Sequence, residues 1–146
     1  MTDESGPHKI VVGIDGSPPS VDAFRWAVRQ AQVTGAVVEA VMTWQYQGAL
    51  IPVGPENLTI EADAKRALDG AIRDVVVESA PPIQVTRSVE EGEAALILVD
   101  RSKDASLLVI GSRGDGAFVG MLIGSVSQYC VSHAHCPVVV LRGHEG

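Results

Sequence analysis

The sequence predicts an α/β fold, a three-layer sandwich in which helices cover both faces of a five-stranded, parallel sheet. Short and almost wholly apolar runs recur along the chain, as is typical of strands buried on both faces of such a sheet. Segments with apolar residues at the three- and four-residue spacing of a helix separate these runs. The length of 146 residues suits a single domain, 1–146, whose polar ends at 1–7 and 143–146 are expected to be flexible.

The first half of the chain predicts two strands and two helices. Ser17 and Pro18 begin the first helix, because serine caps helices well and proline suits the first helical position. Pro81 and Pro82 end the second helix. In chain order we expect a strand at 10–14, a helix from Ser17 to Gly35, a strand at 37–43, a loop at 44–57 and a helix at about 58–79.

The second half predicts three strands and two helices around a glycine-rich segment. Glu90 and Glu91 are expected with Glu93 at a helix start, where acids favour the positive end of the helix dipole. In chain order we expect a strand at 83–89, a helix at 93–101, a strand at 106–110, a glycine-rich loop at 111–124, a helix at 125–133 and a strand at 137–141.

The glycine-rich loop is the strongest candidate for a binding site. Ligands of α/β sheets bind beyond the carboxyl ends of the strands, where the strand order reverses. Glycines let main-chain N–H groups approach an anion, and the following helix, which Ser125 can cap, offers unpaired N–H groups. No lysine lies in the loop, so it is not a Walker phosphate loop. The alternative is that these glycines only shape a tight connection.

Three segments resemble the universal stress protein family. Gly111-x-x-Gly114, followed after nine residues by Gly124-Ser125, looks like the family's ATP-binding signature. Residues 11–17 resemble its opening strand and turn, and residues 136–140 resemble its closing strand. The resemblance implies the strand order 3-2-1-4-5 and a bound adenine nucleotide, ATP, which is expected to arrive with Mg²⁺. It implies adenine contacts at Asp15 and Thr43, adenosine contacts at Gly13, Ile110 and Gly111, and ribose and phosphate contacts at Gly111, Gly114, Gly124, Ser125 and Val126.

Two charged residues of this site have alternative interpretations. Asp15 follows a strand and precedes a helix, so it either contacts the nucleotide or only stabilises the turn. Arg113 is the cation of the loop and either pairs with a phosphate or remains solvated.

Composition excludes several classes of function. The net charge of −7 argues against a nucleic-acid-binding protein, and no apolar run reaches the ~20 residues of a membrane helix. Without a signal pattern, the expected location is the cytoplasm. The cysteines and histidines at positions 130, 133, 135 and 136 match no standard zinc spacing, so we expect no metal site.

The sequence therefore predicts a nucleotide sensor or regulator in the stress response. No pair of nucleophile and base is recognisable, so we expect binding with at most slow ATP hydrolysis. The resemblance also implies a homodimer through the last strand, whose apolar residues 138–141 need a cover. One alternative is a dimeric, stress-linked interaction protein that keeps the loop for structure alone. Another is an enzyme acting on a nucleotide-like substrate.

Overall fold

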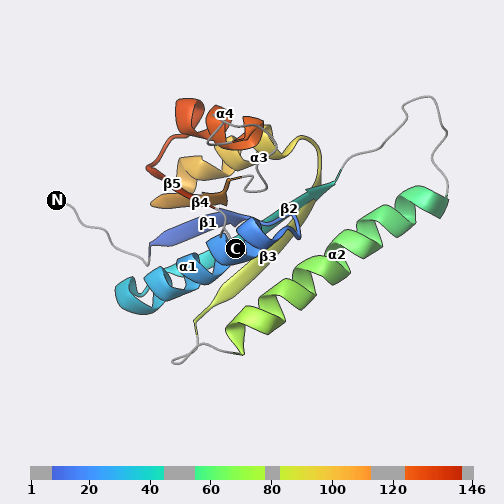
Figure 1. Cartoon of the computed structure of the whole chain (residues 1–146), viewed down its shortest axis with the longest axis horizontal. Helices are drawn as coiled ribbons and strands as arrows, with labels where there is room; N and C mark the ends of the chain where they lie inside the picture. Colours follow the sequence, from blue (N-terminus) through green and yellow to red (C-terminus); the bar gives the residue numbers. More distant parts are fainter. Residues whose placement is uncertain (1–7, 45–54, 78–82, 113–123, 143–146) are drawn as a thin grey trace.

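The computed structural model describes residues 8–44, 55–77, 83–112 and 124–142. Its strands and helices alternate along the chain (Figure 1). In order they are β1 (Lys9–Gly13), α1 (Pro18–Thr34), β2 (Val37–Trp44), α2 (Pro55–Val76), β3 (Val85–Glu91), α3 (Ala94–Arg101), the short 3₁₀ helix η1 (Ser102–Asp104), β4 (Leu107–Gly111), α4 (Ser125–His133) and β5 (Val138–Leu141).

The five strands form one parallel sheet in the order β3-β2-β1-β4-β5, which confirms the predicted fold class and strand order. From β1 the chain proceeds to β2 and β3 on one side, and then crosses back to β4 and β5 on the other. The strand order therefore reverses between β1 and β4. A crevice forms at such a point, because the helices that follow the two strands lie on opposite faces.

Helices cover both faces of the sheet (Figure 1). On one face α1 and α2 bury a cluster that includes Phe24 and Leu68 against β1 and β2. On the other face α3 and α4 contribute Leu98 and Cys130 to a smaller cluster over β1, β2 and β4. The strands alternate between the two clusters along their length, because successive side chains of a strand point to opposite faces.

Both ends of α1 confirm the sequence prediction. The Ser17 hydroxyl accepts the Ser20 N–H at 3.4 Å, and Pro18 is the first helical residue. At the other end Gly35 adopts φ 81°, a left-handed conformation that glycine reaches without strain. These caps fix where β1 ends and where β2 begins.

Several boundaries differ from the predictions. Helix α2 begins at Pro55, because proline fits the first turn of a helix as well as a loop. Strand β3 runs from Val85 to Glu91, so Glu90 and Glu91 belong to a strand and only Glu93 lies at the helix start. The predicted stop at 81–82 lies outside the described residues.

Among the helices of the described residues, none combines the length and the apolar character that a membrane crossing requires.

Candidate functional site

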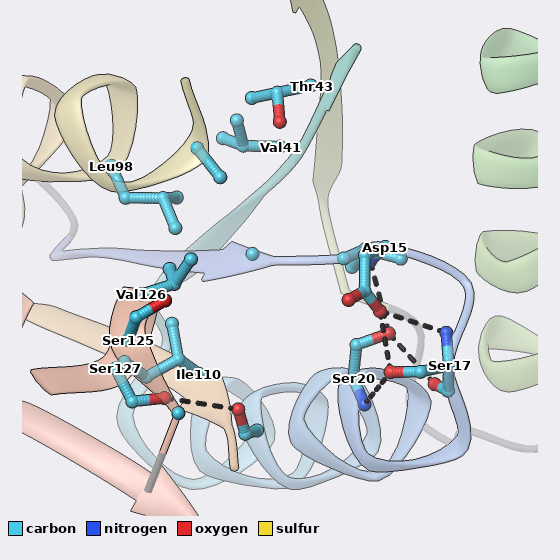
Figure 2. Close-up of a pocket in the computed structure, with 15 residues that line it drawn as sticks. Asp15, Ser17, Ser20, Val41, Thr43, Leu98, Ile110, Ser125, Val126 and Ser127 are labelled. Carbon is cyan, nitrogen blue, oxygen red and sulfur yellow. Dashed lines mark hydrogen bonds between the residues drawn. The ribbon is translucent and has the colours of Figure 1, made fainter. Parts of the chain in front are cut away.

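A crevice opens at the carboxyl ends of β1 and β4, where the strand order reverses (Figure 2). Its volume is about 140 Å³, whereas sites that enclose a whole small ligand measure roughly 300–1,000 Å³. The described crevice therefore has room for one part of such a ligand. It is lined by Gly13, Ile14, Asp15, Ser17, Ser20, Val41, Thr43, Ala94, Leu98, Ile110, Gly111, Gly124, Ser125, Val126 and Ser127.

Asp15 is held in place by the start of α1. Its carboxylate accepts the Ser17 N–H at 2.9 Å and the Ser17 hydroxyl at 2.6 Å, and the Asp15 N–H donates to the Ser20 hydroxyl at 3.2 Å (Figure 2). Burial works to raise the pKa of Asp15, but the hydrogen bonds from Ser17 and Ser20 together hold it below its usual value. Asp15 is therefore a fixed carboxylate at neutral pH.

Two glycines of the crevice lie where neighbouring residues leave little room for a side chain. A Cβ at Gly111 would lie 2.5 Å from the Pro19 main-chain oxygen, so β4 passes the first turn of α1 only without a side chain. A Cβ at Gly13 would lie 2.9 Å from Leu98 Cδ1 of α3. Both glycines thus let helices approach the strand ends closely, and this approach forms two walls of the crevice.

Strand alternation determines where the main chain of Thr43 points. The Ile14 N–H donates to the Val41 oxygen at 2.8 Å, so odd-numbered residues of β2 face β1. The Gly92 N–H donates to the Trp44 oxygen at 2.8 Å, so even-numbered residues face β3. Since β1 ends before it reaches the level of Thr43, the Thr43 N–H and C=O point past the end of β1 and toward the crevice.

Helix α4 closes the other side of the crevice. Its N-cap is Gly124, which offers no side chain to the helix end, and Ser125 is the first helical residue. The prediction that Ser125 caps this helix is therefore wrong. The Ser127 hydroxyl donates to the Gly111 oxygen at 3.3 Å and ties α4 to β4 (Figure 2). The first N–H groups of α4, which have no acceptor within the helix, remain available at the crevice.

The crevice is poor in groups for acid–base or metal chemistry. Among the described lining residues, Asp15 carries the one formal charge. Within the described parts of the chain, no cluster of three or more histidine, cysteine or acidic residues could hold a metal ion. Burial raises the pKa of the Cys130 thiol to about 11, so this cysteine stays protonated and packs as an apolar side chain.

The model of the universal stress protein family, Usp, matches residues 7–142. The chain belongs to the universal stress protein family. It is 39% identical over 146 residues to the universal stress protein Rv2623 of Mycobacterium tuberculosis, an alignment covering 93% of this chain and 48% of that protein. A universal stress protein of Mycolicibacterium smegmatis is 37% identical, with 91% of this chain and 45% of that protein covered. The chain thus spans about half the length of these relatives.

Solved structures of the family have the same fold. The universal stress protein UspA from Lactobacillus plantarum superposes with a TM-score of 0.77 at 29% identity, covering 95% of this chain and 100% of that one. Three more distant structures contain nucleotides: a universal stress protein with cAMP (22% identity, TM-score 0.63, 96% and 100% covered), one from Arabidopsis thaliana with AMP (18%, 0.62, 94% and 93%) and one from Archaeoglobus fulgidus with dAMP (20%, 0.64, 91% and 96%).

The crevice of this universal stress protein brings together all the predicted site residues that the structure describes. They are Gly13, Asp15, Thr43, Ile110, Gly111, Gly124, Ser125 and Val126. Arg113 and Gly114 lie outside the described residues, and their predicted phosphate contacts stay predictions.

Sequence reasoning missed several of the crevice walls. Val41 lies two residues before Thr43 on the same face of β2, and that alternation could have identified it. Ser20 could have been suspected from its place in the first turn of α1. Leu98 and Ala94 carry no such signal, because an apolar pattern identifies the buried side of α3 but not which strand end it covers.

Proposed function

We propose that this universal stress protein binds an adenine nucleotide, ATP, in the crevice and regulates a stress response through its nucleotide-bound state. The observation that carries the proposal is the orientation of the Thr43 main chain toward a crevice with apolar walls. Val41, Leu98 and Ile110 supply those walls, which suit the faces of a purine ring.

The Thr43 main chain distinguishes adenine from guanine. Adenine presents an acceptor at N1 beside a donor at its N6 amine, which complements one N–H and one C=O of the same residue. Guanine presents a donor at N1 beside an acceptor at O6, so the Thr43 N–H would face another donor and the Thr43 C=O another acceptor. Leaving buried polar groups unpaired costs about 1–3 kcal/mol each. We therefore expect ATP to bind and GTP to bind much more weakly.

The phosphates would then lie near the start of α4. The N–H groups of its first turn and the helix dipole favour an anion there, and the uncapped Gly124 leaves room for one. Gly114 and Arg113 complete this subsite in the proposal, and a triphosphate would bring Mg²⁺ bound mainly through its own oxygens. The cAMP, AMP and dAMP found in distant family members support an adenine nucleotide as the ligand class.

Turnover is expected to be slow at most. Phosphoryl transfer needs a group that positions the attacking water and cations that neutralise the developing charge. Asp15 is fixed by Ser17 and Ser20, and the described crevice contains no lysine, arginine or histidine. We therefore propose a binding and signalling role in which the nucleotide is retained.

We also propose that the protein forms a homodimer through β5. All four residues of this edge strand, Val138–Leu141, are only partly buried although each is apolar. The Pro137 carbonyl accepts the Leu108 N–H of β4, and the Leu141 carbonyl accepts the N–H of Ser112, which follows β4 directly. The alternate residues Val138 and Val140 therefore direct their N–H and C=O groups away from β4. A second copy could pair with this free edge and cover its apolar side chains.

The site is tested by replacing Gly124 with glutamate. The new carboxylate would occupy the proposed phosphate position and repel the nucleotide. The apparent affinity for ATP, measured from the thermal stabilisation that ATP gives, should therefore fall at least about tenfold, or about 1.4 kcal/mol. Gly70→Glu is the matched control, because Gly70 lies on α2 with open space around it and the charge change is the same. If Gly124→Glu binds ATP as well as Gly70→Glu does, the proposed site is wrong.

A further inference from the structure

A second cavity continues from the crevice past Thr43, and we call it the side groove. Its volume is about 530 Å³. It shares Thr43, Ala94, Ser125 and Val126 with the crevice, so the two cavities adjoin each other. Its remaining described walls come from the ends of β2 and β3 and from the helices α3 and α4, namely Trp44, Gly92, Glu93, Ala95 and Tyr129.

The walls of the side groove suit a flat apolar group. Ala94 and Ala95 have short side chains, so the first turn of α3 leaves space above it. Tyr129 is 36% exposed, and its ring stacks on the His133 ring with 4.1 Å between the ring centroids. This stack restricts the tyrosine ring, which thus offers a fixed apolar surface to the groove.

Charge limits what the side groove can hold. Glu93 carries the one formal charge among the described residues that line it, and its side chain caps no helix N–H. The Glu93 carboxylate disfavours an anionic group beside the start of α3, whereas it does not disfavour an uncharged apolar group there.

We propose that the side groove receives an uncharged apolar substituent on the N6 amine of the adenine base. The inference rests on the proposed function, in which the Thr43 C=O accepts one N6 hydrogen. Trp44 follows Thr43 in β2 and lines the groove, so the Thr43 C=O lies nearer to the groove than the Thr43 N–H does. Since N6 pairs with the C=O and N1 with the N–H, N6 lies on the side of the base that faces the groove. The second N6 hydrogen is free and is replaced by the substituent. N6-monosubstituted adenine nucleotides are thus the ligand class that fills both cavities.

The experiment compares ATP, N6-benzyl-ATP and N6,N6-dimethyl-ATP by calorimetric titration of the purified protein. N6-benzyl-ATP keeps one N6 hydrogen and should bind at least as tightly as ATP. N6,N6-dimethyl-ATP has no hydrogen left to donate to Thr43 and should bind about tenfold more weakly or worse. Binding of ATP together with a loss of tenfold or more for N6-benzyl-ATP would overturn the inference alone. Failure of ATP itself to bind would overturn the proposed function and this inference with it.

Ala95→Phe assigns the effect to the side groove. Ala95 lines the groove but not the crevice, so a phenyl ring there should fill the groove and leave the crevice open. We expect this variant to weaken N6-benzyl-ATP by about tenfold and to leave ATP within about threefold of the unmodified protein. An equal effect on both nucleotides, or no effect on either, contradicts the assignment of the substituent to the groove.

Discussion

Gly111 lies where β4 passes the first turn of α1, and a methyl group has no room there. The obstacle is the Pro19 main chain, which cannot turn aside as a side chain can. At Gly13 the close contact would be with the flexible end of the Leu98 side chain, and Ile110 lies at an ordinary contact distance. The two glycines are alike in the sequence and both were predicted to line a nucleotide, yet they differ in what surrounds them.

This difference predicts unequal costs for the same substitution. Gly111→Ala should lower the free energy of unfolding by about 2–3 kcal/mol, and Gly13→Ala by about 1 kcal/mol, because Leu98 can shift. Gly70→Ala is the control, since it fills open space in the interior of a helix and should raise stability by about 0.5–1 kcal/mol. Chemical denaturation measures all three, and equal costs at Gly13 and Gly111 would contradict the packing argument.

Residue identity alone could predict many of the site residues but not the contacts that orient them. Asp15 was recognisable because it follows a strand at the end where α/β proteins bind ligands, and Gly124 because it belongs to the glycine signature that resembles the family's. The hydrogen bonds that fix Asp15 involve Ser17 and Ser20, and they depend on the conformation of the turn between β1 and α1, which residue identity does not specify. The main-chain orientation of Thr43 depends on the register of two strand pairs, which a sequence does not specify.

At the scale of elements, α3 is held to the sheet by a network of charges. Arg101, at its last position, pairs with Glu39 of β2 and Glu90 of β3 and donates to the Ser88 hydroxyl at 2.9 Å. Lys9 of β1 approaches Glu39 at 3.3 Å. One turn before Arg101, Leu98 forms a wall of the crevice, so this network also positions part of the site.

Arg101→Met should therefore destabilise the protein by about 2 kcal/mol. Removing one partner of a fully buried pair costs about 3–5 kcal/mol, and Arg101 retains 24% of its side-chain exposure, which lowers that figure. Arg66→Met is the matched control, because the Arg66–Asp63 pair lies on the surface and should contribute less than about 1 kcal/mol. The double variant Arg101→Met with Glu39→Gln should regain part of the free energy of unfolding that Arg101→Met loses. If the losses of the two single variants simply add in the double variant, the network is excluded.

The same elements show where sequence patterns are ambiguous. The acidic run 90–93 was predicted to begin a helix, but two of its members lie in β3. Glu90 belongs there because it faces Arg101, a partner eleven positions later that no local pattern reveals. By contrast, the caps of α1 depend on neighbouring residues and were predicted correctly.

At the scale of the whole molecule, β5 is an edge strand whose outer side pairs with no other strand of the described residues. Val140→Pro should abolish the proposed dimer while keeping the fold, because the Val140 N–H points away from β4. Val139→Pro should instead break a β4–β5 hydrogen bond and lower the melting temperature by several degrees. Light scattering coupled to size-exclusion chromatography reports the mass, and a dimer that survives Val140→Pro would place the contact elsewhere.

The order of the strands was predictable only through the family resemblance. Alternating strands and helices indicate a parallel sheet, but they leave open which strands are neighbours. The reversal between β1 and β4, on which the crevice depends, is a property of the complete fold. The segment 113–123 of the glycine signature lies outside the described residues, so its part in the site stays a prediction.

The most direct test follows the main-chain amides of the crevice by nuclear magnetic resonance during titration with ATP and with GTP. We expect ATP to shift the Thr43 amide and the amides at the start of α4 in a saturable manner, and GTP at the same concentration to leave the Thr43 amide nearly unchanged. If ATP moves none of these amides, or if GTP shifts Thr43 as far as ATP does, an adenine-specific site at the end of β2 is contradicted.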